Sequence, residues 1–459
     1  MHIVILGGSP KGAKSVTMQY VNYLKAIAPG HSFTEYYPAA SIKAIESDGA
    51  TLQSIINDIE RADAVLWAFP LYYGLVHGDY KRFIELVLEN DMAASFRGKH
   101  CAILATSIHF FDNTAIEYIR GISEDMGMIV DEVYSAHMDD LMRVDGQEQC
   151  KLFLRQWEKK ICCNINLGRL SAPIIPEPRR VVLEENFHAA PYSNIKFGLV
   201  TESGISENLD DMVNAMNNEF AHVELFDLSK MKISGSCRGC LKCGYENHCV
   251  YDGKDDVIDT YRKLKECDAI VFSGAIKDRY LSAKWKVFID RWFFATHIPF
   301  FDGKVIGFVI SGPLRQIPSL RTFFFDFFEA QGLTVGGIVT DESTGNVGLE
   351  IRGLAATLDS YCTDGYHPPR RFLGESGHKV FRDEIFGGLK GVFVADHKYY
   401  KRSKLYDFPH RNWRKRFVTT FMCIAMKLPF VRKEIQTNMA DYMVKPYEPI
   451  IKSASQQVH

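Results

Sequence analysis

The chain has 459 residues, of which 46% are hydrophobic and 24% are charged, and its formal net charge is −2. This length predicts two or three domains with ample core. The near-zero charge argues against nucleic acid as a partner, because binding to phosphates requires a basic surface. The longest apolar stretch, Phe417 to Phe430, contains Lys427 and is too short to span a bilayer. A strand-like N-terminus without a signal peptide predicts a cytoplasmic, thiol-reducing location.

The first predicted element is a strand at residues 3–6, and a glycine-rich turn and a helix follow it. Such a turn presents backbone N–H groups that can bind phosphate. The spacing of an NTPase phosphate loop is not met, and the simpler alternative is a plain turn with Ser15 as the helix cap. The turn offers the hydroxyl groups of Ser9, Ser15 and Thr17 and the charges of Lys11 and Lys14.

Two further loops follow the next strands of the first half, predicted at residues 64–68 and 101–105. The first loop, Pro70 to Gly74, has aromatic side chains and backbone amides that could hold a flat heteroaromatic ring. Tyr72 and Tyr73 could equally be ordinary half-buried loop residues. The second loop begins with Thr106-Ser107. We expect both loops to border one crevice, because ligands of doubly wound sheets bind at the carboxyl ends of the strands.

The two halves of the chain repeat each other at a constant offset of 205 residues, which indicates a tandem duplication. Each half alternates short apolar strands with amphipathic helices, so we predict two doubly wound α/β domains with parallel sheets. The matched positions include Lys81 with Lys286, Glu85 with Asp290, and 96–99 with 301–304. The predicted domains are 1–170 and 194–362, joined by a proline-bearing linker at 171–193 (Pro173, Pro176, Pro178, Pro191) and followed by a basic, mainly helical extension at 363–459.

The second half carries a C-x2-C-x2-C-x5-C array of four cysteines within thirteen residues, in a loop rich in glycine and polar residues. Four thiolates at these spacings suit a cubane iron–sulfur cluster. Zinc also binds four thiolates, although its usual pattern is two separated C-x-x-C pairs. Thiol redox chemistry needs only two of the four. The expected metal ligands are Cys237, Cys240, Cys243 and Cys249.

The pattern G-S-P-K, S-V-T, P-L-Y-Y and K-R-F-I-E in the first half resembles the flavodoxin-like NADPH-dependent FMN reductase family. The cysteine array, with the downstream K-V-F-I-D-R, resembles the iron–sulfur flavoprotein branch of that family. The resemblance covers about 1–165 and 194–360. It implies a [4Fe–4S] centre on the four cysteines and a flavodoxin-like fold for both halves. It also implies FMN on Ser9, Lys11, Ser15 and Thr17 (phosphate) and on Pro70, Leu71, Tyr72, Tyr73, Gly74, Thr106 and Ser107 (isoalloxazine).

The second half departs from the flavin pattern, since Glu202 and Glu207 stand in its first loop and would repel a phosphate. We therefore expect the first half to hold the flavin and the second half to hold the cluster. The implied activity is electron transfer from NAD(P)H or a ferredoxin through FMN and the cluster to an unknown acceptor. No side chain is required as general acid or base, and Tyr72 and Tyr73 are candidates for tuning the flavin. The alternatives are a cluster-free quinone or nitro reductase with zinc or thiols, and a non-catalytic electron carrier.

The extension is strongly basic between residues 396 and 433, with eleven Lys or Arg against two Asp. The simplest interpretation is a helix docked on the paired domains, with its charges in solvent. The alternatives are contact with an anionic membrane or with an acidic protein such as a ferredoxin. The family resemblance also implies a homo-oligomer.

Overall fold

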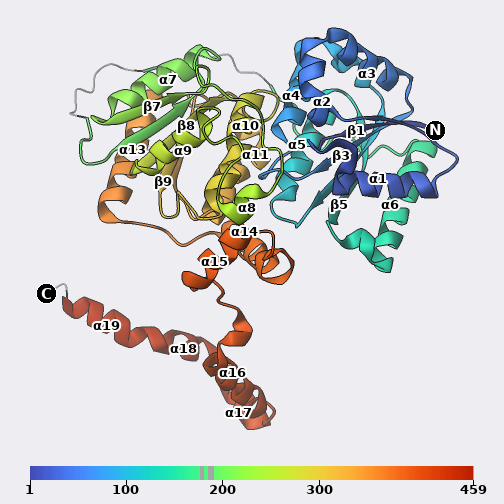
Figure 1. Cartoon of the computed structure of the whole chain (residues 1–459). Helices are drawn as coiled ribbons and strands as arrows, with labels where there is room; N and C mark the ends of the chain where they lie inside the picture. Colours follow the sequence, from blue (N-terminus) through green and yellow to red (C-terminus); the bar gives the residue numbers. More distant parts are fainter. Residues whose placement is uncertain (176–179, 184–190, 458–459) are drawn as a thin grey trace. The chain divides into compact units, whose positions relative to one another are not determined.

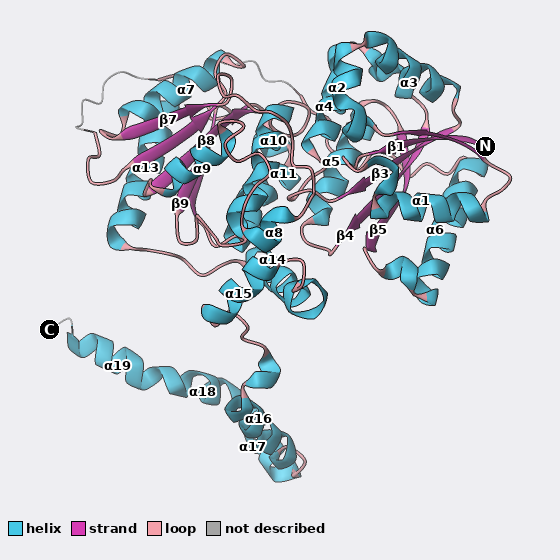
Figure 2. Ribbon diagram, viewed as in Figure 1, coloured by secondary structure: helices cyan, strands magenta, loops and turns pink. Residues whose placement is uncertain are grey.

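The computed structural model describes residues 1–175, 180–183 and 191–457. Its framework is two five-stranded parallel sheets with the strand orders β2-β1-β3-β4-β5 and β10-β9-β8-β6-β7 (Figure 2). Read from β7 to β10, the second order repeats the first. It is the strand order of a flavodoxin-like doubly wound sheet, so the predicted fold class is confirmed. The strands are β1 (His2–Gly7), β2 (Ser32–Tyr36), β3 (Ala64–Pro70), β4 (His100–Ser107), β5 (Ile129–His137), β6 (Phe197–Thr201), β7 (Val223–Asp227), β8 (Ala269–Ala275), β9 (Val305–Ser311) and β10 (Thr334–Thr340).

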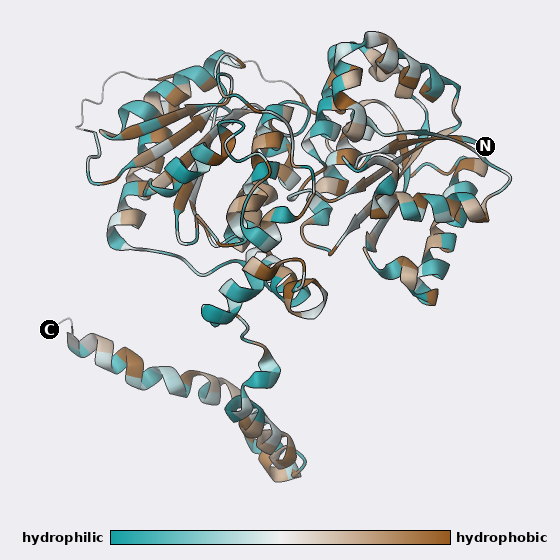
Figure 3. Ribbon diagram, in the orientation of Figure 1, coloured by the Kyte–Doolittle hydropathy of each residue, from teal (hydrophilic) through white to brown (hydrophobic). Residues whose placement is uncertain are grey.

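Helices cover both faces of the first sheet (Figure 1). Helices α1 and α6 pack on one face with Ile5 and Leu66, whereas α3, α4 and α5 pack on the other with Leu6 and Trp67. Neighbouring residues of one strand thus enter opposite cores, which explains why these strands are apolar throughout (Figure 3). The helices are α1 (Val16–Ile27), α2 (Pro38–Ser47), α3 (Gly49–Arg61), α4 (Gly78–Glu89), α5 (Asp112–Asp125) and α6 (Val144–Cys162).

The second sheet is covered in the same way. Helices α7 and α13 bury one of its faces with Leu199 and Val271, and α9 and α10 cover the other. The core around α9 and α10 is continuous with the core around α4, so the two domains share buried apolar contacts. The helices are α7 (Glu207–Asn218), α8 (Lys242–Glu246), α9 (Val257–Lys265), α10 (Ala283–Arg291), α11 (Pro318–Thr322), α12 (Phe328–Ala330) and α13 (Val347–Asp364).

The domains meet through α4 and α10, and two backbone contacts made by one helix are repeated by the other. Glu85 accepts a hydrogen bond from the backbone N–H of Ala283 at 2.6 Å. Asp290 accepts the equivalent bond from Gly78 at 2.8 Å. These positions are related by the 205-residue offset, since 78 corresponds to 283 and 85 to 290. The repeat found in the sequence therefore builds an interface with the reciprocal contacts of a two-fold dimer.

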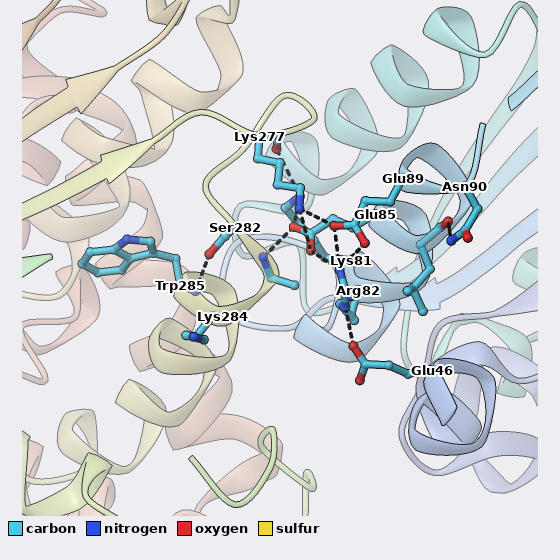
Figure 4. A network of polar contacts seen from close by, with 12 residues as sticks. Glu46, Lys81, Arg82, Glu85, Glu89, Asn90, Lys277, Ser282, Lys284 and Trp285 are labelled. Atoms are coloured by element: carbon cyan, nitrogen blue, oxygen red, sulfur yellow. Dashed lines mark hydrogen bonds and ion pairs between the residues drawn. The ribbon is translucent and has the colours of Figure 1, made fainter. Parts of the chain in front are cut away.

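The two matched lysines complete this interface. Lys81 is fully buried, and its Nζ donates to Glu85 at 3.0 Å and to the carbonyl of Lys277 at 3.1 Å (Figure 4). Lys286 is equally buried, and it donates to Asp290 and, at 2.9 Å, to the carbonyl of Tyr72. Each domain thus fixes a loop of the other.

Residues 1–399 form one compact unit and residues 400–459 form a second. The extension is helical, as predicted, and no residue of its helix α16 is buried. No helix in the described part of the chain has both the length and the apolarity to cross a membrane. The extension contains α14 (Phe372–Glu384), a π-helical turn η7 (Ile385–Leu389), α15 (Val394–Arg402), α16 (Trp413–Ala425), α17 (Pro429–Thr437), α18 (Met439–Val444) and α19 (Glu448–Gln457).

The predicted domain limits stay predictions. Both sheets lie within the ranges proposed for the two domains, 1–170 and 194–362. Residues 176–179 and 184–190 of the linker at 171–193, including Pro176 and Pro178, lie outside the described residues. Partner contacts through 396–433 and a homo-oligomer also stay predictions.

Candidate active site

A cavity of about 320 Å³ lies at the carboxyl ends of β1, β3 and β4, where the sequence places the flavin loops. Nine of the eleven residues expected to bind flavin line it. The nine are Ser9, Lys11, Ser15, Pro70, Leu71, Tyr72, Tyr73, Thr106 and Ser107. The second domain and the extension supply the opposite wall, with Asp290, Phe293, Thr296, Gln331, Phe381, Leu389, Val392 and Phe393.

The other two expected residues support the cavity without lining it. Thr17 is buried, and its hydroxyl is 2.6 Å from that of Thr106. The carbonyl of Gly74 accepts a hydrogen bond from Thr114. Gly74 has φ +72°, in the left-handed region that favours glycine, and so continues the sharp turn after Tyr73. Both residues therefore shape the loops that carry the cavity-lining side chains.

The four cysteines line a second, smaller cavity beside the first. Cys237, Gly239, Leu241 and Phe293 border both cavities. The two regions that the sequence associates with flavin and with metal are therefore in direct contact within one chain.

Gly239 lies where the cysteine loop meets the flavin loops. Its φ is +58°, and a Cβ atom built on it would lie 2.3 Å from the hydroxyl oxygen of Tyr72 and 3.4 Å from Cε of Lys11. A side chain at this position would force the two loops apart. Glycine thus permits the close approach of the two sites.

His77 anchors the cysteine loop to the first domain. Its Nε2 lies 2.7 Å from the carbonyl oxygen of Cys237, and its Nδ1 lies 3.2 Å from the backbone nitrogen of Asp79. Since a carbonyl can only accept and an N–H can only donate, Nε2 carries the ring hydrogen. Burial lowers the pKa of His77 to about 4, so the ring is neutral at pH 7. The carboxylate of Asp79 adds a hydrogen bond from Ser236.

Arg291, at the end of α10, anchors the same loop to the second domain. Its guanidinium binds both carboxylate oxygens of Asp255, at 3.1 and 3.0 Å, and donates to the carbonyl of Gly235 at 3.0 Å. The cation also lies 4.0 Å from the ring centre of Tyr251. A planar donor with this reach is specific to arginine, and a lysine would not reproduce it.

The thiols of this loop lie in an environment that disfavours bare thiolates. Burial raises the pKa of Cys237 to about 12, with further contributions from Asp290, Cys249 and Cys240. Burial likewise raises the pKa of Cys243. A metal cation would remove this penalty, because a ligating thiol is deprotonated. Within the described residues, no three His, Cys, Asp or Glu side chains are arranged closely enough to hold a metal ion. The four cysteines share a cavity, and their role as ligands stays a prediction.

One sulfur of the loop has a buried polar neighbour. Nε2 of His297 lies 3.2 Å from Sγ of Cys243, and Nδ1 lies 2.8 Å from a carboxylate oxygen of Asp396 in α15. His297 is 0% exposed and Asp396 is 1% exposed.

The loops of the second half that correspond to the flavin loops are bound by their own carboxylates. Asp227 accepts hydrogen bonds from the backbone N–H and hydroxyl of Ser203, at 3.2 and 2.6 Å. Asp341 accepts from the N–H of Gly312 and from Ser311. The pKa of Asp227 lies well below its usual range. Burial opposes this shift, but the hydrogen bonds from Ser203 and Ser229 outweigh it. Negative charge thus lies at these loops of the second half, and its exclusion of a phosphate stays a prediction.

Sequence reasoning missed several residues of the site. His77 occupies the helix-capping position that Ser282 holds in the second half, so the repeat could have identified its capping role. Nothing in the sequence connects His297 with Asp396, which follows it by 99 residues. The same holds for Phe381, Leu389, Val392 and Phe393, which lie in the extension outside the repeat.

Comparison with known proteins supports the resemblance. The family model for NADPH-dependent FMN reductase matches residues 1–130 and 198–341. An iron-sulfur flavoprotein from Archaeoglobus fulgidus is 30% identical over 202 residues, which is 43% of this chain and 90% of that protein.

Solved structures with a similar fold include the apo form of the NADH:FMN oxidoreductase EMOB, at 19% identity and TM-score 0.30, covering 35% of this chain and 89% of that one. Another is the general stress protein 14 from Treponema denticola in complex with FMN, at 14% identity and TM-score 0.28. The match covers 34% of this chain and 98% of that one. The matches of the family model span more than half of the chain, once in each domain. The chain therefore belongs to the NADPH-dependent FMN reductase family and is an NAD(P)H-dependent FMN oxidoreductase.

Proposed function

We propose that this oxidoreductase is an iron–sulfur flavoprotein that holds one FMN and one [4Fe–4S] cluster in adjacent sites of a single chain. The observation that supports it most is the common wall formed by Cys237, Gly239 and Leu241, which border both cavities. The relative from Archaeoglobus fulgidus carries the name of such a protein. Electrons would enter from NAD(P)H or a ferredoxin and leave to an acceptor that the chain does not identify.

The first cavity fits FMN in the chemistry of its lining. Ser9, Lys11 and Ser15 bring hydroxyl groups and a positive charge to the N-terminus of α1, which suits a phosphate. Pro70 to Tyr73 and Thr106-Ser107 would surround the ring. When bound, FMN accepts a hydride and releases electrons singly, and a [4Fe–4S] cluster carries one electron at a time.

The difference between the two halves supports the proposal of one flavin per chain. In the second half, Asp227 and Asp341 bind the loops that correspond to the phosphate and ring loops. These carboxylates would repel a phosphate group. The second half instead supplies the cysteine loop and, through Lys286 and Asp290, fixes the Tyr72 to Gly78 loop of the first.

The cysteine cavity fits a cluster in its donor set, since four sulfurs from one anchored loop border it. His77 and Arg291 hold the backbone carbonyls of Cys237 and Gly235, and they thereby anchor the start of the loop to both domains. Zinc on the same cysteines is the alternative, and it would give a cluster-free reductase.

The test is anaerobic purification followed by reduction with NADPH. We expect a yellow flavin absorbance that NADPH bleaches rapidly, together with a broad brown absorbance from iron bound to sulfur. Cys240→Ser should abolish the brown absorbance, whereas Cys267→Ser, a buried cysteine outside the loop, should leave it unchanged. Zinc in place of iron would contradict the cluster. Slow bleaching by NADPH with rapid reduction by ferredoxin would favour an electron carrier over a reductase.

A further inference from the structure

The contact between His297 and Cys243 has a consequence for the proposed cluster, on which the following inference rests. We propose that His297, oriented by Asp396, donates a hydrogen bond from Nε2 to Sγ of Cys243 when this sulfur ligates the cluster, and that the bond raises the reduction potential of the cluster. His297 is thus assigned as a positioning and tuning residue. It has no place in hydride transfer.

Two phenylalanine rings and two polar contacts hold the ring of His297. Phe293 packs edge-on against it with ring centres 4.5 Å apart, and Phe393 packs on it at 5.5 Å. The ring is fully buried, and the two polar contacts use both of its nitrogens. The ring therefore cannot rotate away from the sulfur without losing a buried hydrogen bond.

The direction of the hydrogen bond follows from the chemistry of the sulfur. A thiolate that ligates a metal carries no hydrogen and can only accept. The hydrogen of the contact to Cys243, 3.2 Å long, must then be on Nε2. With Nε2 donating to the sulfur, the contact between Nδ1 and Asp396 needs a second hydrogen, carried by the ring or by the Asp396 carboxyl, and this contact orients the ring.

A hydrogen bond to a ligand sulfur changes the electron affinity of a cluster. The N–H dipole withdraws negative charge from the sulfur and so favours the state with one more electron. The low dielectric of a buried site strengthens this effect. Cys237 differs, because its buried histidine neighbour, His77, bonds to the backbone carbonyl.

The inference also gives the extension a role at the redox centre. Asp396 and Phe393 lie beyond residue 341, where the match of the family model ends. They nevertheless hold the ring that contacts Cys243. The extension thus contributes to the surroundings of the cluster as well as to the wall of the flavin cavity.

The test compares the cluster potential and iron content of anaerobically purified full-length variants. His297→Phe keeps a ring between Phe293 and Phe393 but removes the donor. We expect it to keep its iron and to shift the equilibrium with a one-electron reference dye about tenfold toward the oxidised cluster, or about 59 mV. His297→Gln, which retains an N–H donor, should restore part of the shift. Asp396→Asn should shift the potential in the same direction by less.

The matched control is His100→Phe. His100 also pairs with a buried carboxylate, Asp131, at 3.0 Å, but at the opposite end of β4 from the cavities. This variant should leave the potential unchanged.

An unchanged potential in His297→Phe with full iron would overturn the inference and leave the proposed function intact. Should His297→Phe lose its iron, the potential of Asp396→Asn decides, and a wild-type value there would also overturn the inference. Wild-type protein without iron would instead overturn the proposed function.

Discussion

Gly239 borders both cavities, and it allows a direct test of their contact. In Gly239→Ala, we expect backbone strain of about 1–3 kcal/mol and a further loss of FMN affinity, because the new Cβ meets Tyr72. Gly253→Ala is the matched control, since Gly253 has a similar φ of +69° but open space around it. Equal FMN affinity in the two variants, measured by fluorescence titration, would contradict the proposed proximity.

His77 should make stability depend on pH. Its folded pKa, about 4, lies below the ordinary value of 6.5, so the unfolded state binds more protons between these values. Stability is therefore complete above pH 6.5 and is lost as the pH falls, by about 2 kcal/mol at pH 5. Urea unfolding at pH 7 and pH 5 measures this loss. His77→Gln should flatten the dependence, whereas His109→Gln, at an exposed side chain, should not. If His77→Gln leaves the pH dependence of the free energy of unfolding unchanged, His77 is not its source.

At the scale of elements, the reciprocal packing of α4 and α10 should carry much of the domain interface. Glu85→Ala leaves Lys81 buried without its carboxylate and the N–H of Ala283 without an acceptor. We expect a loss of about 3–5 kcal/mol in the free energy of unfolding. Glu46→Ala removes an exposed partner of Arg82 at the rim of the same network and should cost at most about 1 kcal/mol (Figure 4). Similar small losses in both variants would show that the buried network does not stabilise the interface.

The same elements show how far the sequence could predict the fold and the site. The alternation of apolar strands with amphipathic helices and the 205-residue offset were sufficient to predict both sheets. The matched Lys81 and Lys286 proved to be equivalent interface residues. The cavity-lining loops were predictable because the carboxyl ends of parallel strands share one edge. Contacts such as that of His297 with Asp396 could not be predicted from the sequence. They depend on how a segment outside the repeat packs on the paired domains.

At the scale of the whole molecule, two truncations should separate the roles of the extension. Removal of 403–459 keeps Asp396 and every residue that lines the two cavities, so FMN and iron contents should stay at wild-type levels. Removal of 365–459 also takes Phe381, Leu389, Val392 and Phe393 from the cavity wall, and FMN affinity should fall at least about tenfold. Loss of FMN and iron after removal of 403–459 would show that the last residues are also needed for the two sites.

The central claim concerns cofactor content, and chemical analysis of anaerobically purified full-length protein tests it most directly. FMN released on denaturation and metals measured by mass spectrometry should give one FMN and four iron atoms per chain. Two FMN per chain, or FMN accompanied by zinc or by no metal, would contradict the account.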